Sequence, residues 1–240
     1  MYATANTNLL RRLSDLDITT GSAEEEQLRL FLGMAAGSLA RSDLNISSFL
    51  NSESLKVVLS TISSRWNGRV RYRGFPPFVS PEVLDLLGKW CVESRKFGSR
   101  VDKFAMSHPC AEARQFLVDH QESFRKLLGS DAHHFALNRA MFVHYEESGD
   151  RSDPHLDEID HEVNIVICVR HRHLTSISAL RVFGKSPNPE IFVLSPGEAV
   201  VFDGAFLVHG REPVGLNEAI DILTVGFRRK ENAELHSILT

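Results

Sequence analysis

Pro154-His155-Leu156-Asp157 and Phe206-Leu207-Val208-His209 are the two stretches that decide the fold of this chain. His155 and Asp157 are two residues apart. Side chains on an extended strand repeat with a period of two, so this imidazole and this carboxylate point the same way. His209 ends another apolar run, far enough along the chain for it to cross to the opposite sheet of a small barrel and return. The three side chains therefore form a candidate metal site.

Two imidazoles and one carboxylate on one face of an octahedron are the ligand set of non-haem Fe(II) oxygenases. Three further segments accompany the motif: Ser195-Pro196-Gly197-Glu198, Ala199-Val200-Val201-Phe202-Asp203 and His209-Gly210-Arg211-Glu212-Pro213-Val214. The first is a turn and the second a strand. An H-x-D tripeptide alone is a weak signal, but the ordered set resembles the Fe(II)/2-oxoglutarate-dependent dioxygenase superfamily over residues 137–229.

The C-terminal part of the chain is rich in short strand-like segments. The predicted strands span residues 135–145, 162–170, 174–183, 191–194, 198–202, 206–211 and 219–229. Short strands separated by turns, with no helix-period segment among them, are typical of sandwiches and barrels. Together with the ligand motif, they indicate a double-stranded β-helix, which is a jelly-roll or cupin-like barrel.

The N-terminal half has apolar residues at helical spacing instead. Helices are predicted over residues 23–41, 52–64 and 111–128, and from Ser80-Pro81-Glu82 onward. The sequence therefore predicts an α+β protein with a helix-rich N-terminal half. Residues 1–134 would buttress the barrel, and residues 135–240 would form the double-stranded β-helix core with the metal site, within one continuous domain.

The composition is ordinary for a globular protein, with 42% hydrophobic and 24% charged residues. A formal net charge of -4 and a pI near 6.3 argue against a nucleic-acid partner. A surface that binds nucleic acid usually carries a stripe of basic residues that contact the phosphates. The cysteines Cys91, Cys110 and Cys168 are widely spaced and odd in number, which indicates reduced thiols. No apolar run approaches the ~20 residues of a membrane span, so we expect a cytoplasmic protein with no membrane partner.

One stretch of the N-terminal half combines basic and aromatic residues. Its members are Arg65, Trp66, Arg69, Arg71, Tyr72, Arg73 and Phe75. The alternation from Arg69 to Arg73 predicts a short strand or an extended loop. We interpret its arginines either as a solvated strand face or as the lip of a pocket for an anionic substrate, because the guanidinium fork matches carboxylates and phosphates. Arg73 is the candidate substrate-binding residue of this stretch.

The resemblance to the dioxygenase superfamily implies the cofactors. The catalytic metal, Fe(II), would be held by His155, Asp157 and His209, with open positions for 2-oxoglutarate and O2. Members of the superfamily convert 2-oxoglutarate to succinate and CO2 while they oxidise a substrate. Related halogenases have a small residue in place of the carboxylate ligand, so Asp157 favours hydroxylation, desaturation or ring formation.

In many members of the superfamily, a basic residue that anchors 2-oxoglutarate follows the distal histidine at a characteristic distance along the chain. At that distance from His209 this chain has Ala219. Three arginines remain as alternatives: Arg228 later on the same strand, Arg211 close to the distal histidine, and Arg181 on an earlier strand. Arg228 has the opposite parity to Ala219, so without a bulge it should face the other side of the sheet. The sequence leaves the choice among the three open.

Two residues on the strand before the H-x-D motif complete the candidate pocket. Tyr145 and Arg139 occupy positions where members of the superfamily often line the oxo-acid or substrate pocket. Tyr145 is therefore a candidate cofactor-binding residue and Arg139 a candidate substrate-binding residue. Asn164 could hydrogen-bond a substrate or a neighbouring backbone group.

The resemblance predicts an oxygenase that acts on a small molecule, such as an amino acid, another carboxylate or a biosynthetic intermediate. The first alternative is an oxygenase of nucleic acid or of protein side chains, with residues 65–73 as its contact surface. The second alternative is a barrel that binds metal without using 2-oxoglutarate. The reason to consider it is that Ala219 stands where many members have the basic residue that anchors 2-oxoglutarate.

Overall fold

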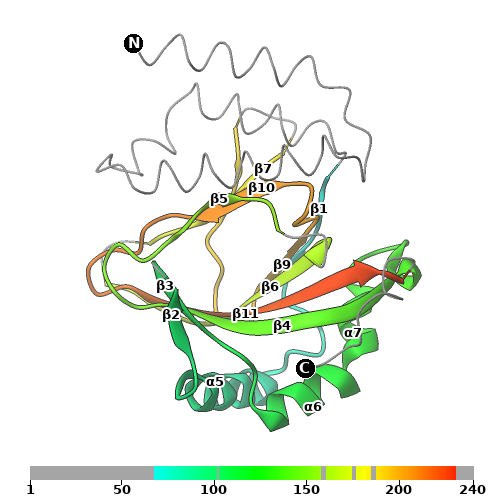
Figure 1. Ribbon diagram of the computed structural model, residues 1–240, viewed down its shortest axis with the longest axis horizontal. Helices are drawn as coiled ribbons and strands as arrows, with labels where there is room; N and C mark the ends of the chain where they lie inside the picture. The colour runs from blue at the N-terminus through cyan, green and yellow to red at the C-terminus, as the bar shows by residue number, and fades with distance from the viewer. Residues whose placement is uncertain (1–67, 102, 158–160, 175–176, 185–187, 231–240) are drawn as a thin grey trace.

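Two antiparallel sheets face each other in the computed structural model of the chain, which describes residues 68–101, 103–157, 161–174, 177–184 and 188–230 (Figure 1). The larger sheet has the order β1 (Val70–Gly74), β9 (Ala199–Phe202), β6 (Val163–Arg172), β11 (Ala219–Arg229), β4 (Phe135–Tyr145), β3 (Phe104–Ser107) and β2 (Ser99–Val101). The smaller sheet has the order β5 (Ser152–His155), β10 (Val208–Arg211), β7 (Leu180–Phe183) and β8 (Glu190–Phe192). The helices α5 (Pro81–Arg95), α6 (Ala111–Asp119) and α7 (Gln121–Lys126) cover the outer face of the larger sheet.

Successive strands of the C-terminal part pass back and forth between the two sheets. Strands β4, β6, β9 and β11 belong to the larger sheet, and the intervening strands β5, β7, β8 and β10 belong to the smaller one. This winding is the double-stranded β-helix that the sequence predicts. The α+β class and the barrel are therefore confirmed.

The central strands β6, β9 and β11 of the larger sheet are buried on both faces, and strand periodicity assigns their side chains to two separate cores. On β11, Ile220 and Ile222 point into the barrel, whereas Leu223 and Phe227 pack against the helices. Buried strands of this kind read as continuous apolar runs rather than alternating ones. The run over residues 165–169 of β6 has this character.

Strands β4 and β11 have the predicted bounds, and β6, β8, β9 and β10 begin and end within two residues of the predicted ones. Strand β7 begins only at Leu180 of the range predicted over residues 174–183, and β5 is not among the predicted strands. The helix predicted to begin after Ser80 is α5, capped by the Val83 N–H bond to Ser80 Oγ at 3.3 Å. The helix predicted over residues 111–128 is divided at His120 into α6 and α7, and a 3₁₀ turn, η1 (Ala132–His134), follows. Within the described residues, no helix is long and apolar enough to cross a lipid bilayer.

The sheet also crosses the predicted division at residue 134. Strands β1, β2 and β3 precede that residue, yet all three belong to the larger sheet. The sequence predicts β1 but not β2 and β3, which are too short, at three and four residues, to show an alternating pattern. The helices predicted over residues 23–41 and 52–64 lie outside the described residues, so a helical buttress formed by the N-terminal region stays a prediction.

We expect Ile167→Ala to lower the free energy of unfolding by about 2–5 kcal/mol, because Ile167 is fully buried against the helices and its truncation leaves a cavity. The matched control is Ile191→Ala on β8, where the side chain is 52% exposed and the expected change is within about 1 kcal/mol. Urea unfolding followed by circular dichroism measures both. Equal effects of the two variants would contradict the assignment of the core.

Candidate metal centre

The three candidate ligands converge at one end of the smaller sheet. His155 on β5 is the direct antiparallel partner of His209 on β10, so the two imidazoles lie side by side on one face, with ring centroids 4.4 Å apart. Asp157 follows β5, and its Oδ1 lies 3.6 Å from the Nε2 atom of each histidine. The ligand atoms all lie within 4.8 Å of one another.

Hydrogen bonds fix the tautomer of both histidines. Nδ1 of His155 donates to the carbonyl of Asp153 at 2.7 Å, and Nδ1 of His209 donates to the carbonyl of Leu207 at 2.9 Å. Each Nε2 is therefore the nitrogen that faces Asp157, 3.6 Å from its Oδ1. Outer hydrogen bonds of this kind orient histidine ligands in metalloproteins.

The orientation of Asp157 is fixed as tightly as that of the imidazoles. Its Oδ2 accepts a hydrogen bond from Asn164 Nδ2 at 3.0 Å, which leaves Oδ1 to face the imidazoles. Its backbone N–H donates to the carbonyl of Gly204 at 2.9 Å. A Cβ atom at Gly204 would lie 2.2 Å from Asp157 Oδ2, so any other residue there would displace the carboxylate from its present position. Asn164 thus contacts a candidate ligand, a third possibility beside the substrate and backbone roles expected from sequence, and the sequence carries no local signal for Gly204.

The charges of the cluster favour an ionised carboxylate. Burial alone would raise the pKa of Asp157, but the charge and hydrogen bonds of His209 and His155 outweigh burial and hold this pKa well below its usual range. Burial alone would likewise lower the pKa of His155, but the hydrogen bond and charge of Asp157 raise it. Two nitrogen donors and one carboxylate oxygen fit a divalent metal of the first transition row. Ligands at about 2.1 Å and right angles would be about 3.0 Å apart, so small movements would bring these atoms onto a metal.

Arg211 lies deeper in the barrel, on the same face of β10 as His209. It is 3% exposed, and its guanidinium lies over the ring of Tyr145, with Cζ 5.3 Å from the ring centroid. Its backbone N–H donates to Ser152 Oγ at 3.0 Å. No carboxylate of the described residues forms an ion pair with this guanidinium. The structure thus places two of the predicted cofactor-binding residues together, beyond the candidate ligands.

The other two candidate anchors lie elsewhere. Arg181 faces away from the barrel, opposite to its neighbours Leu180 and Val182, and pairs with Glu212. Arg228 shares the barrel side of β11 with Ile222 but lies near the end of the strand. It therefore faces the barrel.

The two predicted substrate-binding arginines also differ in their surroundings. Arg139 is exposed, on the barrel side of β4. Arg73 donates to Glu198 at 3.0 Å and lies over the ring of Phe192. Neither residue contacts the candidate metal ligands.

Comparison with solved structures supports one fold. An oxidoreductase of the 2OG-Fe(II) oxygenase family from Burkholderia pseudomallei superposes with a TM-score of 0.53 at 15% identity, covering 72% of this chain and 90% of that one. A prolyl hydroxylase from Trichoplax adhaerens, in complex with a hypoxia inducible factor peptide, gives 0.54 at 12% identity, covering 81% and 99%. The alpha ketoglutarate dependent epimerase SnoN from nogalamycin biosynthesis gives 0.51 at 10%, covering 74% and 84%. The chain has the fold of the Fe(II)/2-oxoglutarate-dependent oxygenases. Neither protein-family models nor curated protein sequences match it.

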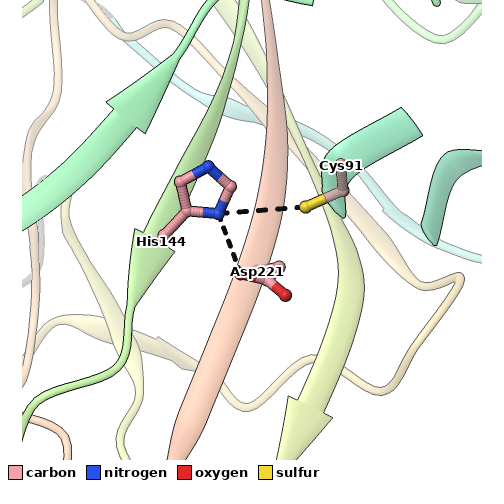
Figure 2. Close-up of side chains that lie close together, drawn as sticks. All are labelled: Cys91, His144 and Asp221. Atoms are coloured by element: carbon pink, nitrogen blue, oxygen red, sulfur yellow. Dashed lines mark hydrogen bonds and ion pairs between the residues drawn. The ribbon is translucent and has the colours of Figure 1, made fainter. Parts of the chain in front are cut away.

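A second cluster of possible ligands lies on the opposite face of this oxygenase fold. Cys91 of α5, His144 of β4 and Asp221 of β11 are buried together between the helix and the larger sheet (Figure 2). Nδ1 of His144 donates to Asp221 Oδ1 at 2.9 Å and lies 3.8 Å from Cys91 Sγ, while its Nε2 accepts from Ser107 Oγ at 3.0 Å. Burial raises the pKa of the Cys91 thiol to about 12, and the negative charge of Asp221 adds to this effect.

Arginines already fill the place that a metal would take in this second cluster. Nη2 of Arg95 lies 2.5 Å from Asp221 Oδ1 and 3.2 Å from His144 Nδ1, and Nη2 of Arg170 lies 2.7 Å from Asp221 Oδ2. The thiol and the carboxylate also face the same imidazole nitrogen, whereas a nucleophile relay requires one on each side. The cluster is therefore a buried ion-pair network and not a catalytic site.

We expect Gly204→Ala in the metal centre to weaken metal binding by about 10- to 100-fold, because the added methyl group must displace the carboxylate of Asp157. The matched control is Gly88→Ala in α5, where a Cβ meets nothing within 4 Å and metal affinity should not change. Anaerobic calorimetric titration with Fe(II) measures both. Unchanged affinity in Gly204→Ala would show that this contact does not position the carboxylate.

Asp221 also predicts a pH dependence of stability. Burial alone would raise its pKa, but the hydrogen bond from His144 and the charges of Arg95 and Arg170 outweigh burial and lower this pKa. A lowered folded-state pKa gives stability that is present above the unfolded value of about 3.9 and is lost as pH falls through the folded value. We expect Asp221→Asn to lower the free energy of unfolding by about 1–3 kcal/mol at pH 7, and the difference to shrink below about pH 4.

Urea unfolding at a series of pH values measures this difference in the free energy of unfolding. Glu146 and Cys91 are the other titratable groups that face the network around Asp221. The control is Glu122→Gln, which breaks an ion pair with Arg125 in which the glutamate is 65% exposed, and we expect a change within about 1 kcal/mol. A difference for Asp221→Asn that stays constant down to pH 2 would contradict the lowered pKa.

Proposed function

We propose that this protein is an Fe(II)/2-oxoglutarate-dependent oxygenase that oxidises a small molecule by hydroxylation, desaturation or cyclisation. One observation carries the proposal: the Nε2 atoms of His155 and His209 both face Oδ1 of Asp157, and the Nδ1 atom of each imidazole is already hydrogen-bonded to a backbone carbonyl. These three residues would hold Fe(II). Bound Fe(II) and 2-oxoglutarate supply oxidation by O2, with 2-oxoglutarate converted to succinate and CO2.

Arg211 is the residue that would hold the distal carboxylate of 2-oxoglutarate. A buried guanidinium is costly unless an anion pairs with it, and among the described residues no carboxylate does so. Arg211 follows His209 at the strand period, so a molecule reaching from the metal into the barrel would meet it. Tyr145 would hold the guanidinium in place through its ring. Arg211 thus supplies the charge that Ala219 lacks, which favours an oxygenase over a barrel that does not use 2-oxoglutarate.

The arginines of the stretch over residues 65–73 were the candidate contact surface for nucleic acid, and their ion pairs favour a small substrate instead. Arg71 pairs with Asp203 and Asp131, and Arg73 pairs with Glu198, so their charges are already neutralised. Arg139 is the exposed cation on the barrel side of β4, and we propose that it meets an anionic group of the substrate. The side chain of His155 is 41% exposed, which leaves an approach to the metal from this side.

We expect the Fe(II)-loaded protein, titrated anaerobically with 2-oxoglutarate, to develop the weak visible absorption band of a chelated 2-oxo acid. Arg211→Gln should weaken 2-oxoglutarate binding by about 30- to 1,000-fold, which corresponds to about 2–4 kcal/mol for a buried charge pair. Arg181→Gln is the matched control, because Glu212 already pairs with that arginine, and it should bind 2-oxoglutarate as the natural protein does. His209→Ala should show no band.

Succinate release in the presence of O2 then tests candidate substrates. Small carboxylates and amino acids should stimulate release, and Arg139→Gln should raise their KM more than it lowers kcat. Iron binding without a band at millimolar 2-oxoglutarate would overturn the oxygenase proposal. A band together with stimulation by peptides alone would overturn the small-molecule part.

A further inference from the structure

The turn between β9 and β10 contacts two of the three candidate ligands. The carbonyl of Gly204 accepts from the Asp157 backbone N–H, and the bare Cα of Gly204 leaves room for the Asp157 carboxylate. The carbonyl of Leu207 accepts from Nδ1 of His209 and so fixes the tautomer of that ligand. The position of this turn therefore sets the orientation of two of the three candidate ligands, Asp157 and His209.

Asp203 is the first residue of the turn and holds it in shape. Its carbonyl accepts hydrogen bonds from the backbone N–H groups of Phe206 at 3.0 Å and Leu207 at 2.8 Å. Its side chain is 8% exposed, and Oδ2 accepts from the Arg69 N–H at 2.8 Å. The Asp203 N–H in turn donates to the Arg69 carbonyl at 3.1 Å. The turn is thus fastened to β1.

Arg71 of β1 completes the attachment. Its Nε donates to Asp203 Oδ1 at 2.5 Å, and its Nη1 donates to Asp131 Oδ1 at 2.7 Å and to the carbonyl of Leu128 at 2.9 Å. The side chain of Arg71 is 6% exposed and lies over the ring of Phe135. The guanidinium therefore ties the turn to the loop that follows α7 through short bonds, and its bond to Asp203 is buried on both sides.

We infer that Arg71 is a positioning residue of the metal centre, acting through Asp203 and the turn that follows it. The inference rests on the proposed function because that function identifies the site as a metal centre. The contacts of Arg71 and Asp203 do not depend on it. Removing the guanidinium leaves the buried Asp203 carboxylate without its charged partner, so the turn loses its shape. Asp157 and His209 then lose the carbonyls that orient them.

Two measurements test this inference, and the first needs no metal. Hydrogen exchange of the metal-free protein should show a protected amide at Asp157, and Arg71→Met should speed its exchange by about 10- to 100-fold. Arg95→Met is the matched control, because Arg95 also pairs at 2.5 Å with a buried aspartate, on the helix side of the sheet. It should lower the melting temperature without a local effect at Asp157.

The second measurement is binding of Co(II), whose visible spectrum reports ligand geometry. Arg71→Met should weaken Co(II) binding by about 10- to 100-fold and shift the spectrum, whereas Arg95→Met should do neither. Arg71→Lys keeps a cation and a donor near Asp203, so it should recover most of the lost affinity. Unchanged exchange at Asp157 in Arg71→Met, or equal effects of Arg95→Met, would overturn the inference. Absence of Co(II) binding in the natural protein would overturn the proposed function, and the exchange data would still decide the role of Arg71.

Discussion

The antiparallel register of β5 and β10 places His155 opposite His209, and the rest of the candidate site depends on it. Side chains alternate along a strand, so a slip of one residue would turn one imidazole to the other face of the sheet. Strand β7 pairs with the far edge of β10, and the hydrogen bond from the Arg211 N–H to Ser152 Oγ links the two strands beyond the histidines. Register, and not any single side chain, makes the cluster.

The larger sheet has the barrel interior on one face and the helices on the other, and the same strands contribute side chains to both. The barrel side carries the candidate metal centre and Arg211, whose charge meets only neutral groups among the described residues. The helix side carries Asp221, whose charge is matched by Arg95 and Arg170. Both faces hold buried charge, but only the helix side neutralises it within the described chain. Ligand chemistry is therefore expected on the barrel side.

Local patterns explain how much of this could be predicted from sequence. Strands β4 and β11 are long apolar runs with clear ends, and the H-x-D motif keeps two ligands adjacent in the chain, although β5 ends at His155 and Asp157 lies just beyond it. The choice among the arginines could not be made, because it depends on partners distant in the chain, such as Glu212 for Arg181. Strands β2 and β3, at the end of the larger sheet, are too short to show a period. The function of the three ligands, and that of Arg211, stays a prediction.

The chain order of the site affects how it is assembled during synthesis. His155 and Asp157 leave the ribosome well before His209, and the carbonyls of Gly204 and Leu207, which orient Asp157 and His209, also come late. A nascent chain therefore carries an incomplete and unoriented set of ligands until β10 pairs with β5. Binding of one metal by all three residues would thus have to wait until the barrel closes.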